Sequence, residues 1–322
     1  MKQISLAESG FERALKRTRK RVFLDEMNCV VPWSELVALI EPHAPKGGTG
    51  RPPFAVAIML RIHFMQQWFG LSDPAMEEAL HDVPLYRAFA GLDAGTGRLP
   101  DETTILRFRH LLEAHQLAGP MLTSINDLLR QKGLMLRTGT VVDATLIAAP
   151  SSTKNSSGTR DAEMHQTKKG NNYYFGMKAH IGADAESGLV HTVIGTAVNV
   201  NDVTQGNALL HGQEADAFGD AGYQGIHKRS DAGDVRWHVA MRPGQRRALN
   251  RQRASDVLID QVERIKASIR AKVEHPLRVI KLQFGFTKVR YRGLAKNAAQ
   301  LTTLFALSNL WMARHKLQAA TG

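Results

Sequence analysis

The spacing of hydrophobic residues divides the chain into a helical first part and a strand-rich second part. Between Arg51 and about Leu117, apolar residues recur at helical intervals, and Ala57, Leu60 and Phe64 indicate a largely buried first helix. Ser72 and Asp101 are residue types that commonly cap helix N-termini, so each marks the start of a further helix. This part of the chain is therefore predicted to form several short helices in succession.

The helix predicted after Asp101 has two different faces. Ile105, Phe108 and Leu112 share an apolar face, whereas Arg107 and His110 lie on the opposite side. A helix with such a polar, basic side has the composition of one that enters a DNA groove, and a solvated helix face has the same composition. Arg107 and His110 are the candidate DNA contacts of this region.

The periodicity changes to a β-type pattern after Gly139. Runs typical of strands cover residues 140–147, 173–181, 189–199, 215–219 and 237–241, and a helical stretch is predicted over 201–212. Residues 151–172 are polar and basic, which favours an exposed flap. Apolar residues at 258, 262, 265, 269 and 273 then step by four, three, four and four, which predicts an amphipathic helix. This order of elements is typical of an α/β layered sheet.

Charge is the feature of the composition that bears most on function. The 322 residues include 42 Lys and Arg against 30 Asp and Glu, a net charge of +12, which points to a polyanion such as nucleic acid. A merely basic protein has the same balance. Six of these bases fall between Arg13 and Arg21, where a DNA-backbone contact and a solvated helix face are equally consistent with the pattern.

Cysteine and hydrophobicity exclude two classes of protein. The single cysteine, Cys29, rules out an intrachain disulfide framework and is expected to be a buried small hydrophobe. The sequence has neither a run of ~18 apolar residues nor an apolar signal core, so a cytoplasmic location is expected.

Three acids are candidates for catalysis. Asp143 interrupts an apolar strand, where burial of an unpaired carboxylate is costly, although a hydrogen-bonded structural Asp is also consistent. Asp220 ends a short strand before a glycine-rich loop, and an Asp-initiated turn is its alternative. Glu274 shares a helix face with Lys266 and Arg270, and a surface ion pair is its alternative.

Taken together, these acids predict a metal site. Two strands and a following helix bring three carboxylates to one sheet edge, where hard oxygen ligands hold two Mg²⁺ ions, with Mn²⁺ able to substitute. Bases along the chain are then expected to contact DNA: Arg270, Arg278, Lys281, Lys168, Lys169, Lys178 and His180. Zinc is the less favoured reading, because His165, His180, His191 and His211 match no compact zinc spacing.

Several longer motifs resemble transposases of the insertion-sequence-five family of bacterial mobile elements. They include Met59–His63, Leu99–Asp101, Phe108–Glu113, Val142–Ile147, Glu163–Gly170, Phe175–Gly182, Asp220–Gly225 and Ile269–Pro276 with Lys281. The likeness extends over nearly the whole chain. The family signature also has a tyrosine upstream of the arginine, whereas no tyrosine lies between Tyr223 and Tyr291 here.

The resemblance implies an α/β fold, with a ribonuclease H-like mixed sheet flanked by helices and preceded by an all-α N-terminal domain. It implies a DDE triad at Asp143, Asp220 and Glu274 with signature bases at Arg270 and Lys281. The expected organisation is a basic arm over 1–50, a helical DNA-binding domain over 51–130 and a catalytic domain over 137–318 that contains the flap.

The expected function is that of a DNA transposase. It binds the terminal inverted repeats of its own element, cleaves the ends and transfers 3′ strands to target DNA within a homo-oligomer. Two alternatives remain open: a stand-alone metal-dependent nuclease, and a DNA-binding derivative that is no longer catalytic. All three acids are present, which argues against the second alternative.

Overall fold

The computed structural model describes residues 17–48, 51–92, 97–136, 138–156, 158–231 and 233–319, so the beginning of the basic arm, including Arg13 and Lys16, lies outside the described residues. The chain forms two compact units, one of residues 1–125 with 313–322 and the other of residues 126–312.

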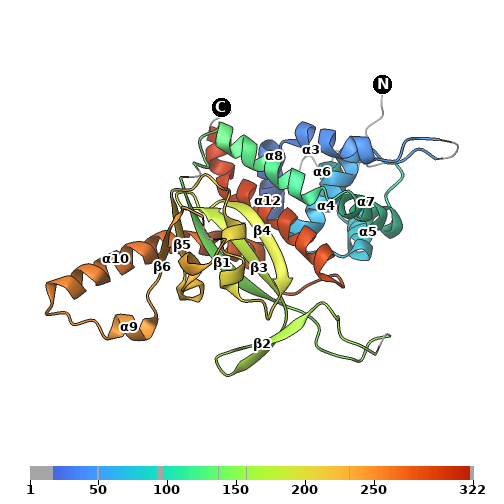
Figure 1. The fold of residues 1–322 in the computed structure, drawn as a ribbon. Helices are drawn as coiled ribbons and strands as arrows, with labels where there is room; N and C mark the ends of the chain where they lie inside the picture. The colour runs from blue at the N-terminus through green and yellow to red at the C-terminus, as the bar shows by residue number, and fades with distance from the viewer. Residues whose placement is uncertain are drawn as a thin grey trace. The chain divides into compact units, whose positions relative to one another are not determined.

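The first unit is helical, as the apolar spacing predicts (Figure 1). Its helices are α2 (Arg19–Val30), α3 (Trp33–Ile40), α4 (Val56–Phe69), α5 (Asp73–Asp82), α6 (Pro84–Ala90) and α7 (Glu102–Ala114), with a 3₁₀ turn η1 (Glu41–His43). Both predicted caps are confirmed: the Ser72 hydroxyl accepts from the Ala75 amide, and the Asp101 carboxylate accepts from the Thr104 amide.

The core of the helical unit is built around α4, whose central residues are buried as predicted. The apolar face of α7 is buried through Ile105, Phe108 and Leu112. Arg109 is also buried, where it pairs with Asp73 and Glu113. The prediction for Cys29 is wrong: its side chain is exposed, because it lies on the outer side of α2, whose buried residues are Leu24, Met27 and Val30.

The second unit is organised by a mixed sheet. Its strands are β1 (Gly139–Ala148), β2 (His165–Lys169), β3 (Asn172–Asp184), β4 (Val190–Ala197), β5 (Asp216–Gly219) and β6 (Arg236–Val239). Strand β3 pairs antiparallel with β1, β2 and β4, whereas β1, β5 and β6 run parallel to one another. The sheet with its flanking helices confirms the expected ribonuclease H-like fold class.

Two stretches differ from the sequence-based expectation. Part of the predicted flap forms strand β2, which pairs with the start of β3 from His165↔Gly176 to Lys169↔Asn172. Residues 201–212 form two 3₁₀ turns, η2 (Asp202–Thr204) and η3 (Asn207–Leu209), rather than a helix. Asn and Gly favour turns over helix, and the two short turns still pack Val203 and Leu209 against the Val142 core cluster.

Further helices follow β6. They are α9 (Pro243–Arg247), α10 (Ala254–Arg270), α11 (Glu274–Arg278) and α12 (Leu294–Ala319), and helix α8 (Ala118–Gln131) precedes the sheet. The stretch around Pro276 is irregular, as the proline predicts: a 3₁₀ turn η6 (Ala271–Val273) leads into α11, and a π turn η7 (Val279–Gln283) follows it. Helix α12 packs on β4, where Gly195 meets Ala298 and the Asn309 side chain bonds to the Val190 backbone.

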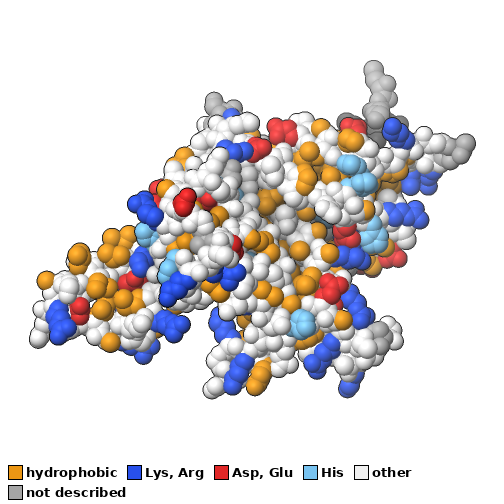
Figure 2. Space-filling model, viewed as in Figure 1, with side chains coloured by type: hydrophobic (Ala, Val, Ile, Leu, Met, Phe, Trp, Pro, Cys, Tyr) orange, Lys and Arg blue, Asp and Glu red, His pale blue; other side chains and the backbone are white. Residues whose placement is uncertain are grey.

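The apolar stripe of α10 is exposed, contrary to the burial expected of an amphipathic helix. Leu258, Val262 and Ile265 are 62%, 45% and 61% exposed, and hydrophobic atoms cover this end of the unit in Figure 2. The buried residue of α10 is instead Glu263, whose carboxylate accepts from the Met241 amide and from Lys266. Polar contacts therefore attach α10 to the sheet edge and leave its apolar side outward.

Candidate catalytic site

Strand pairing brings two of the three candidate acids near each other. Val141 on β1 pairs with Phe218 on the neighbouring parallel strand β5. Asp143 follows Val141 by two residues within β1, and Asp220 follows Phe218 by two residues, directly after the end of β5. The negative charge of Asp220 acts on the carboxyl group of Asp143, so the two side chains lie near each other.

The surroundings of Asp143 penalise its negative charge. Burial is the largest cause that raises the pKa of this carboxyl, to about 6, and the negative charges of Asp220 and Asp202 act in the same direction. The Ala144 amide, which donates to Asp143 Oδ1 at 2.8 Å, and the positive charge of Arg270 oppose the increase. A carboxylate in this position gains from a nearby cation.

Asp220 begins the turn that closes the site on the β5 side. Its Oδ1 accepts from the Gly222 amide at 2.8 Å, which caps the 3₁₀ turn η4 (Ala221–Tyr223). This is the Asp-initiated turn of the structural alternative, and the second carboxylate oxygen is available for another role. Tyr223 is completely buried behind the turn, and its hydroxyl has no hydrogen-bond partner among the described residues.

A fourth acid, Asp202, lies at the same cluster and was missed by sequence reasoning. Its carboxylate contributes to the raised pKa of Asp143 and, with Asp143 and Asp220, to that of Tyr223. Lys178 donates to Asp202 Oδ1 at 2.8 Å and to the Val200 carbonyl at 2.7 Å. The signal in the sequence is weak, because Lys178 and Asp202 are 24 positions apart on different elements.

Glu274, the third predicted acid, enters from the helical side. Arg270 ends α10, and Glu274 follows one turn later as the first residue of α11. The Glu274 side chain is exposed, and its carboxylate makes no hydrogen bond or ion pair with any residue that the structure describes. Arg270 is electrostatically coupled to Asp143, so the helix segment that carries Glu274 adjoins the strand that carries Asp143.

Lys281 ties this helical segment to the catalytic strand. Its ammonium group donates to Thr145 Oγ1 at 2.5 Å and to the Leu146 carbonyl at 3.2 Å. Burial lowers the pKa of Lys281, as does the positive charge of Lys169, whereas Asp143 acts in the opposite direction. Lys281 lies in the π turn η7, a distortion often found at functional sites.

The cluster fits hard divalent cations in its ligand types and its charge. Asp202 on η2 and Asp220 directly after β5 both act on Asp143 of β1, and the positive charge of Arg270 only partly offsets the burial of Asp143. Among the described residues, the ligand atoms of Asp143, Asp220 and Glu274 are not all within 4.8 Å of one another. The ligand atoms of a different group, His191, His211 and Glu214, are that close. Two ions ~3.5–4 Å apart require a wider set of ligands than one ion does.

The other predicted DNA contacts divide by exposure. Lys168 and Lys169 on β2 and Arg278 on α11 are exposed, as are Arg107 and His110 on α7. The prediction that His180 contacts DNA is wrong. Its side chain is 0% exposed, its Nε2 shares a hydrogen bond of 2.8 Å with Thr196 Oγ1, and burial lowers its pKa to about 4. Because the His180 imidazole is neutral and buried, it cannot contact DNA. Lys178 is half-buried and forms an ion pair with Asp202.

Two protein-family models match the chain. A model described as "Transposase DDE domain" matches residues 135–310, more than half of the 322-residue chain. The chain belongs to the DDE transposases. A second model, "Transposase domain (DUF772)", matches residues 12–111 of the transposase, and no solved structure matches the chain. As a DDE transposase it is an enzyme of DNA cleavage and strand transfer, a class that binds DNA and uses divalent metal ions.

The helical unit of the transposase contains a basic hollow beside α7. A cavity of about 410 Å³ is lined by Lys46, Arg51, Arg98 and Arg107 together with apolar residues of α4 and α7. The Arg98 guanidinium lies over the Phe54 ring at 4.3 Å, which fixes one of these charges at its edge. Within the described part of the transposase, no helix is long and apolar enough to cross a bilayer.

Proposed function

We propose that the transposase belongs to the insertion-sequence-five family, binds the terminal inverted repeats of its own element, cleaves the element ends and joins the 3′ strands to target DNA. The observation that carries this proposal is the proximity of Asp143 and Asp220, whose chain segments follow paired residues of β1 and β5: Asp143 is buried, and the charge of Asp220 helps to raise its pKa. The signature spacing of Arg270, Glu274 and Lys281 supports the family assignment.

In this proposal Asp143, Asp220 and Glu274 hold two Mg²⁺ ions, for which Mn²⁺ can substitute. When bound, such ions activate the attacking oxygen and stabilise the leaving oxygen of the phosphodiester. The residues of the chain then position the ligands: the Ala144 and Gly222 amides each fix one oxygen of an aspartate. The exposed Glu274 carboxylate, which has no partner among the described residues, is free to act as the third ligand.

DNA is held at this site by bases on three elements. Arg270 and Lys281 lie beside Asp143, where they neutralise phosphate charge close to the scissile bond. Arg278 extends the same helical side, while Lys168 and Lys169 extend it along the β2–β3 hairpin. Lys178 acts indirectly, because its ion pair positions Asp202.

The helical domain, residues 51–130, recognises the inverted repeats, and the basic arm over 1–50 adds contacts to the DNA backbone. Arg107 and His110 are exposed on the α7 face opposite its buried residues, as a recognition helix requires. The adjoining basic cavity suits a DNA phosphate, since Lys46, Arg51 and Arg98 line it with positive charge. Residues 137–318 form the catalytic domain with its flap over 151–172.

The active form is a homo-oligomer in which α10 pairs with a second copy of itself. Its exposed residues Leu258, Val262 and Ile265 and the partly exposed Ile269 step by four, three and four, the spacing of a coiled-coil seam. A regular apolar stripe of this kind is unusual on a solvated helix and indicates a protein–protein contact. In a two-fold symmetric dimer the same stripe of each copy contacts that of the other, so a second α10 fits it.

Cleavage of DNA that carries the element's own ends tests the proposal. Alanine at Asp143, Asp220 or Glu274 is expected to abolish Mg²⁺-dependent cleavage and strand transfer while inverted-repeat binding persists. Alanine at the exposed acid Asp234 is the matched control and leaves the reaction intact. Hydrolysis without joining to a target would favour a stand-alone nuclease, and binding without cleavage by the wild type would favour a retired DNA-binding derivative.

A further inference from the structure

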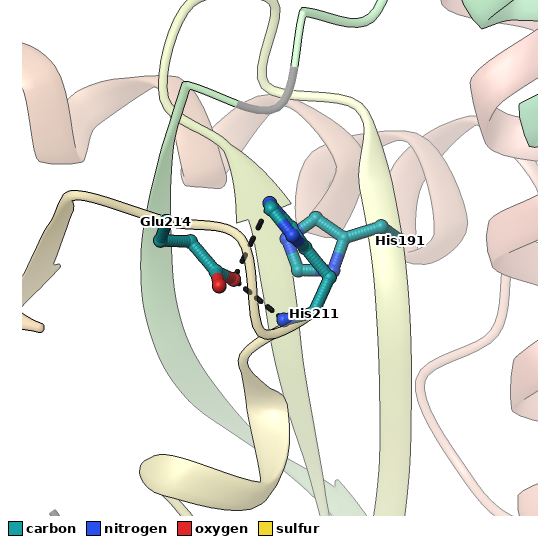
Figure 3. Close-up of side chains that lie close together, drawn as sticks. All are labelled: His191, His211 and Glu214. Carbon is teal, nitrogen blue, oxygen red and sulfur yellow. Dashed lines mark hydrogen bonds and ion pairs between the residues drawn. The ribbon is translucent and has the colours of Figure 1, made fainter. Parts of the chain in front are cut away.

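A second group of ligand-type side chains lies outside the aspartate cluster. One ligand atom each from His191, His211 and Glu214 lies within 4.8 Å of the others, and Figure 3 shows the two rings and the carboxylate converging. His211 Nε2 is 3.3 Å from Glu214 Oε1, and the two imidazole centroids are 5.0 Å apart at an interplanar angle of 77°. The side chains of His211 and Glu214 are 2% and 0% exposed.

The backbone is shaped to bring these residues together. The pairing of β3 with β4 shifts register between Gly182 and Ala183, opposite His191, and such an irregularity redirects side chains. Gly182 leaves the space that the cluster occupies: a Cβ there would lie 2.2 Å from the Leu209 carbonyl and 2.8 Å from the His191 ring. Any larger residue at 182 would push the His191 ring and the Leu209–Glu214 segment away from the sheet.

The partners of Glu214 orient its charge without neutralising it. The carboxylate accepts from the amides of His211 and Gly212 at 2.5 and 2.7 Å and from the Thr140 hydroxyl at 2.8 Å. Thr140 Oγ1 is also 3.0 Å from His191 Nε2, so one hydroxyl orients two members of the cluster. The carboxylate is buried, accepts from uncharged donors and has two imidazoles beside it. This is the arrangement of side chains that bind a metal cation.

We propose that His191, His211 and Glu214 bind a single Zn²⁺ ion. Two imidazoles and one carboxylate are a ligand set that zinc uses, and nitrogen donors disfavour the Mg²⁺ expected at the aspartate cluster. Thr140 supports the ligands from the outer shell.

The zinc site has a structural role distinct from catalysis. Thr140 and Asp143 are three residues apart on β1, so they point to opposite faces of the sheet and lie roughly 10 Å apart along the strand. The ion links β4, through His191, to the segment 211–214 that leads directly into β5. It therefore fixes the start of the strand that ends at Asp220.

Zinc content of the full chain tests the proposal directly. After dialysis against a chelator and return to Zn²⁺, the wild type is expected to retain one ion per chain through gel filtration and to melt at a higher temperature than the metal-free protein. Asp143→Asn is expected to retain the same ion, which separates this site from the catalytic acids. His227→Ala, an exposed histidine in the same unit, is the matched control.

Variants of the cluster give the complementary result. His211→Ala and Glu214→Gln are expected to lose the ion, and Thr140→Val to weaken binding roughly 10–100-fold while keeping all three ligands. Co²⁺ in place of Zn²⁺ should give the visible absorption of a tetrahedral nitrogen–oxygen site in the wild type, in His227→Ala and in Asp143→Asn, and not in His211→Ala or Glu214→Gln. A wild type that retains no zinc, or zinc that persists in His211→Ala, would overturn the proposal and leave a purely hydrogen-bonded cluster.

Discussion

Asp143 and Asp220 each lie two residues beyond a pair of residues, Val141 and Phe218, that face each other on the neighbouring parallel strands β1 and β5. The pairing brings the chain segments that carry the two acids side by side, and the charge of Asp220 raises the pKa of the Asp143 carboxyl. Asp202 and Arg270 act on the same carboxyl group of Asp143, one raising and one lowering its pKa. The pairing of β1 with β5 thus brings together two acids that are 77 positions apart in the sequence.

The ion pair of Lys178 with Asp202 should stabilise the catalytic unit more than a surface pair does. Their side chains are only 15% and 29% exposed, so solvent screens them less. A double-mutant cycle with Lys178→Met and Asp202→Asn, measured by urea unfolding, is expected to give a coupling of about 1 kcal/mol or more. The same cycle on the exposed pair Arg130 and Asp127, each 42% exposed, should give less than about 0.5 kcal/mol. Equal couplings would contradict this assignment.

His63 should make the helical unit sensitive to mild acid. Burial is the main cause that lowers its pKa to about 4, with Arg109 contributing and Asp73 opposing. Because the folded pKa lies below the unfolded value of 6.5, stability is complete above pH 6.5 and falls as the pH drops toward 4. Between pH 7 and 4.5 the wild type should lose about 2–3 kcal/mol more than His63→Leu.

Urea titrations at both pH values measure this difference, and the exposed His81 provides the control. His81→Leu should keep the pH dependence of the wild type. An unchanged pH dependence in His63→Leu would show that another group is responsible for the acid sensitivity.

Lys281 should contribute to cleavage by holding the π turn against β1. Lys281→Met removes its bonds to Thr145 Oγ1 and the Leu146 carbonyl and also removes a charge beside Asp143. Single-turnover cleavage of element ends is expected to slow at least tenfold, about 1.4 kcal/mol in barrier height. Lys288→Met, at an exposed lysine nearby in sequence, should cleave normally. A normal rate for Lys281→Met would assign Lys281 to folding alone.

The α10 stripe should drive self-association without stabilising the monomer. Leu258→Ser and Ile265→Ser replace side chains that are 62% and 61% exposed, so the melting temperature is expected to remain within a few degrees of the wild type. Sedimentation velocity should show the wild-type oligomer dissociating in both variants. Leu136→Ser, at a leucine 57% exposed elsewhere in the chain, should leave the oligomer intact. A wild type that stays monomeric with DNA bound would contradict the pairing.

Local patterns in the sequence predict much of this fold, since they act over few residues. The caps at Ser72 and Asp101 and the strand around Asp143 follow from such patterns. The role of Asp202 does not, because its partner Lys178 comes from another strand. The α10 stripe shows a further limit: helical spacing identifies an apolar side but does not say whether it meets the protein's own core or a second chain.

Histidines illustrate the same limit at both sites. His180 reads as a base near DNA-contact lysines, yet it lies in the part of β3, between Gly176 and Asp184, that is covered on both faces of the sheet. His191 and His211 match no compact metal spacing, and only the register shift at Gly182 and the turn before Glu214 bring them together. Tertiary geometry of this kind leaves no short-range signal in the sequence.

Cysteine substitution with a change of metal tests the central claim, that Asp143, Asp220 and Glu274 bind the catalytic ions. Sulfur is a poor ligand for Mg²⁺ and a better one for softer Mn²⁺. Asp143→Cys, Asp220→Cys and Glu274→Cys should each fail to cleave element ends in Mg²⁺ and regain measurable cleavage in Mn²⁺, whereas Asp234→Cys cleaves in both. Wild-type cleavage in Mg²⁺ by any of the three, or no recovery in Mn²⁺ by all of them, would contradict direct metal binding by this triad.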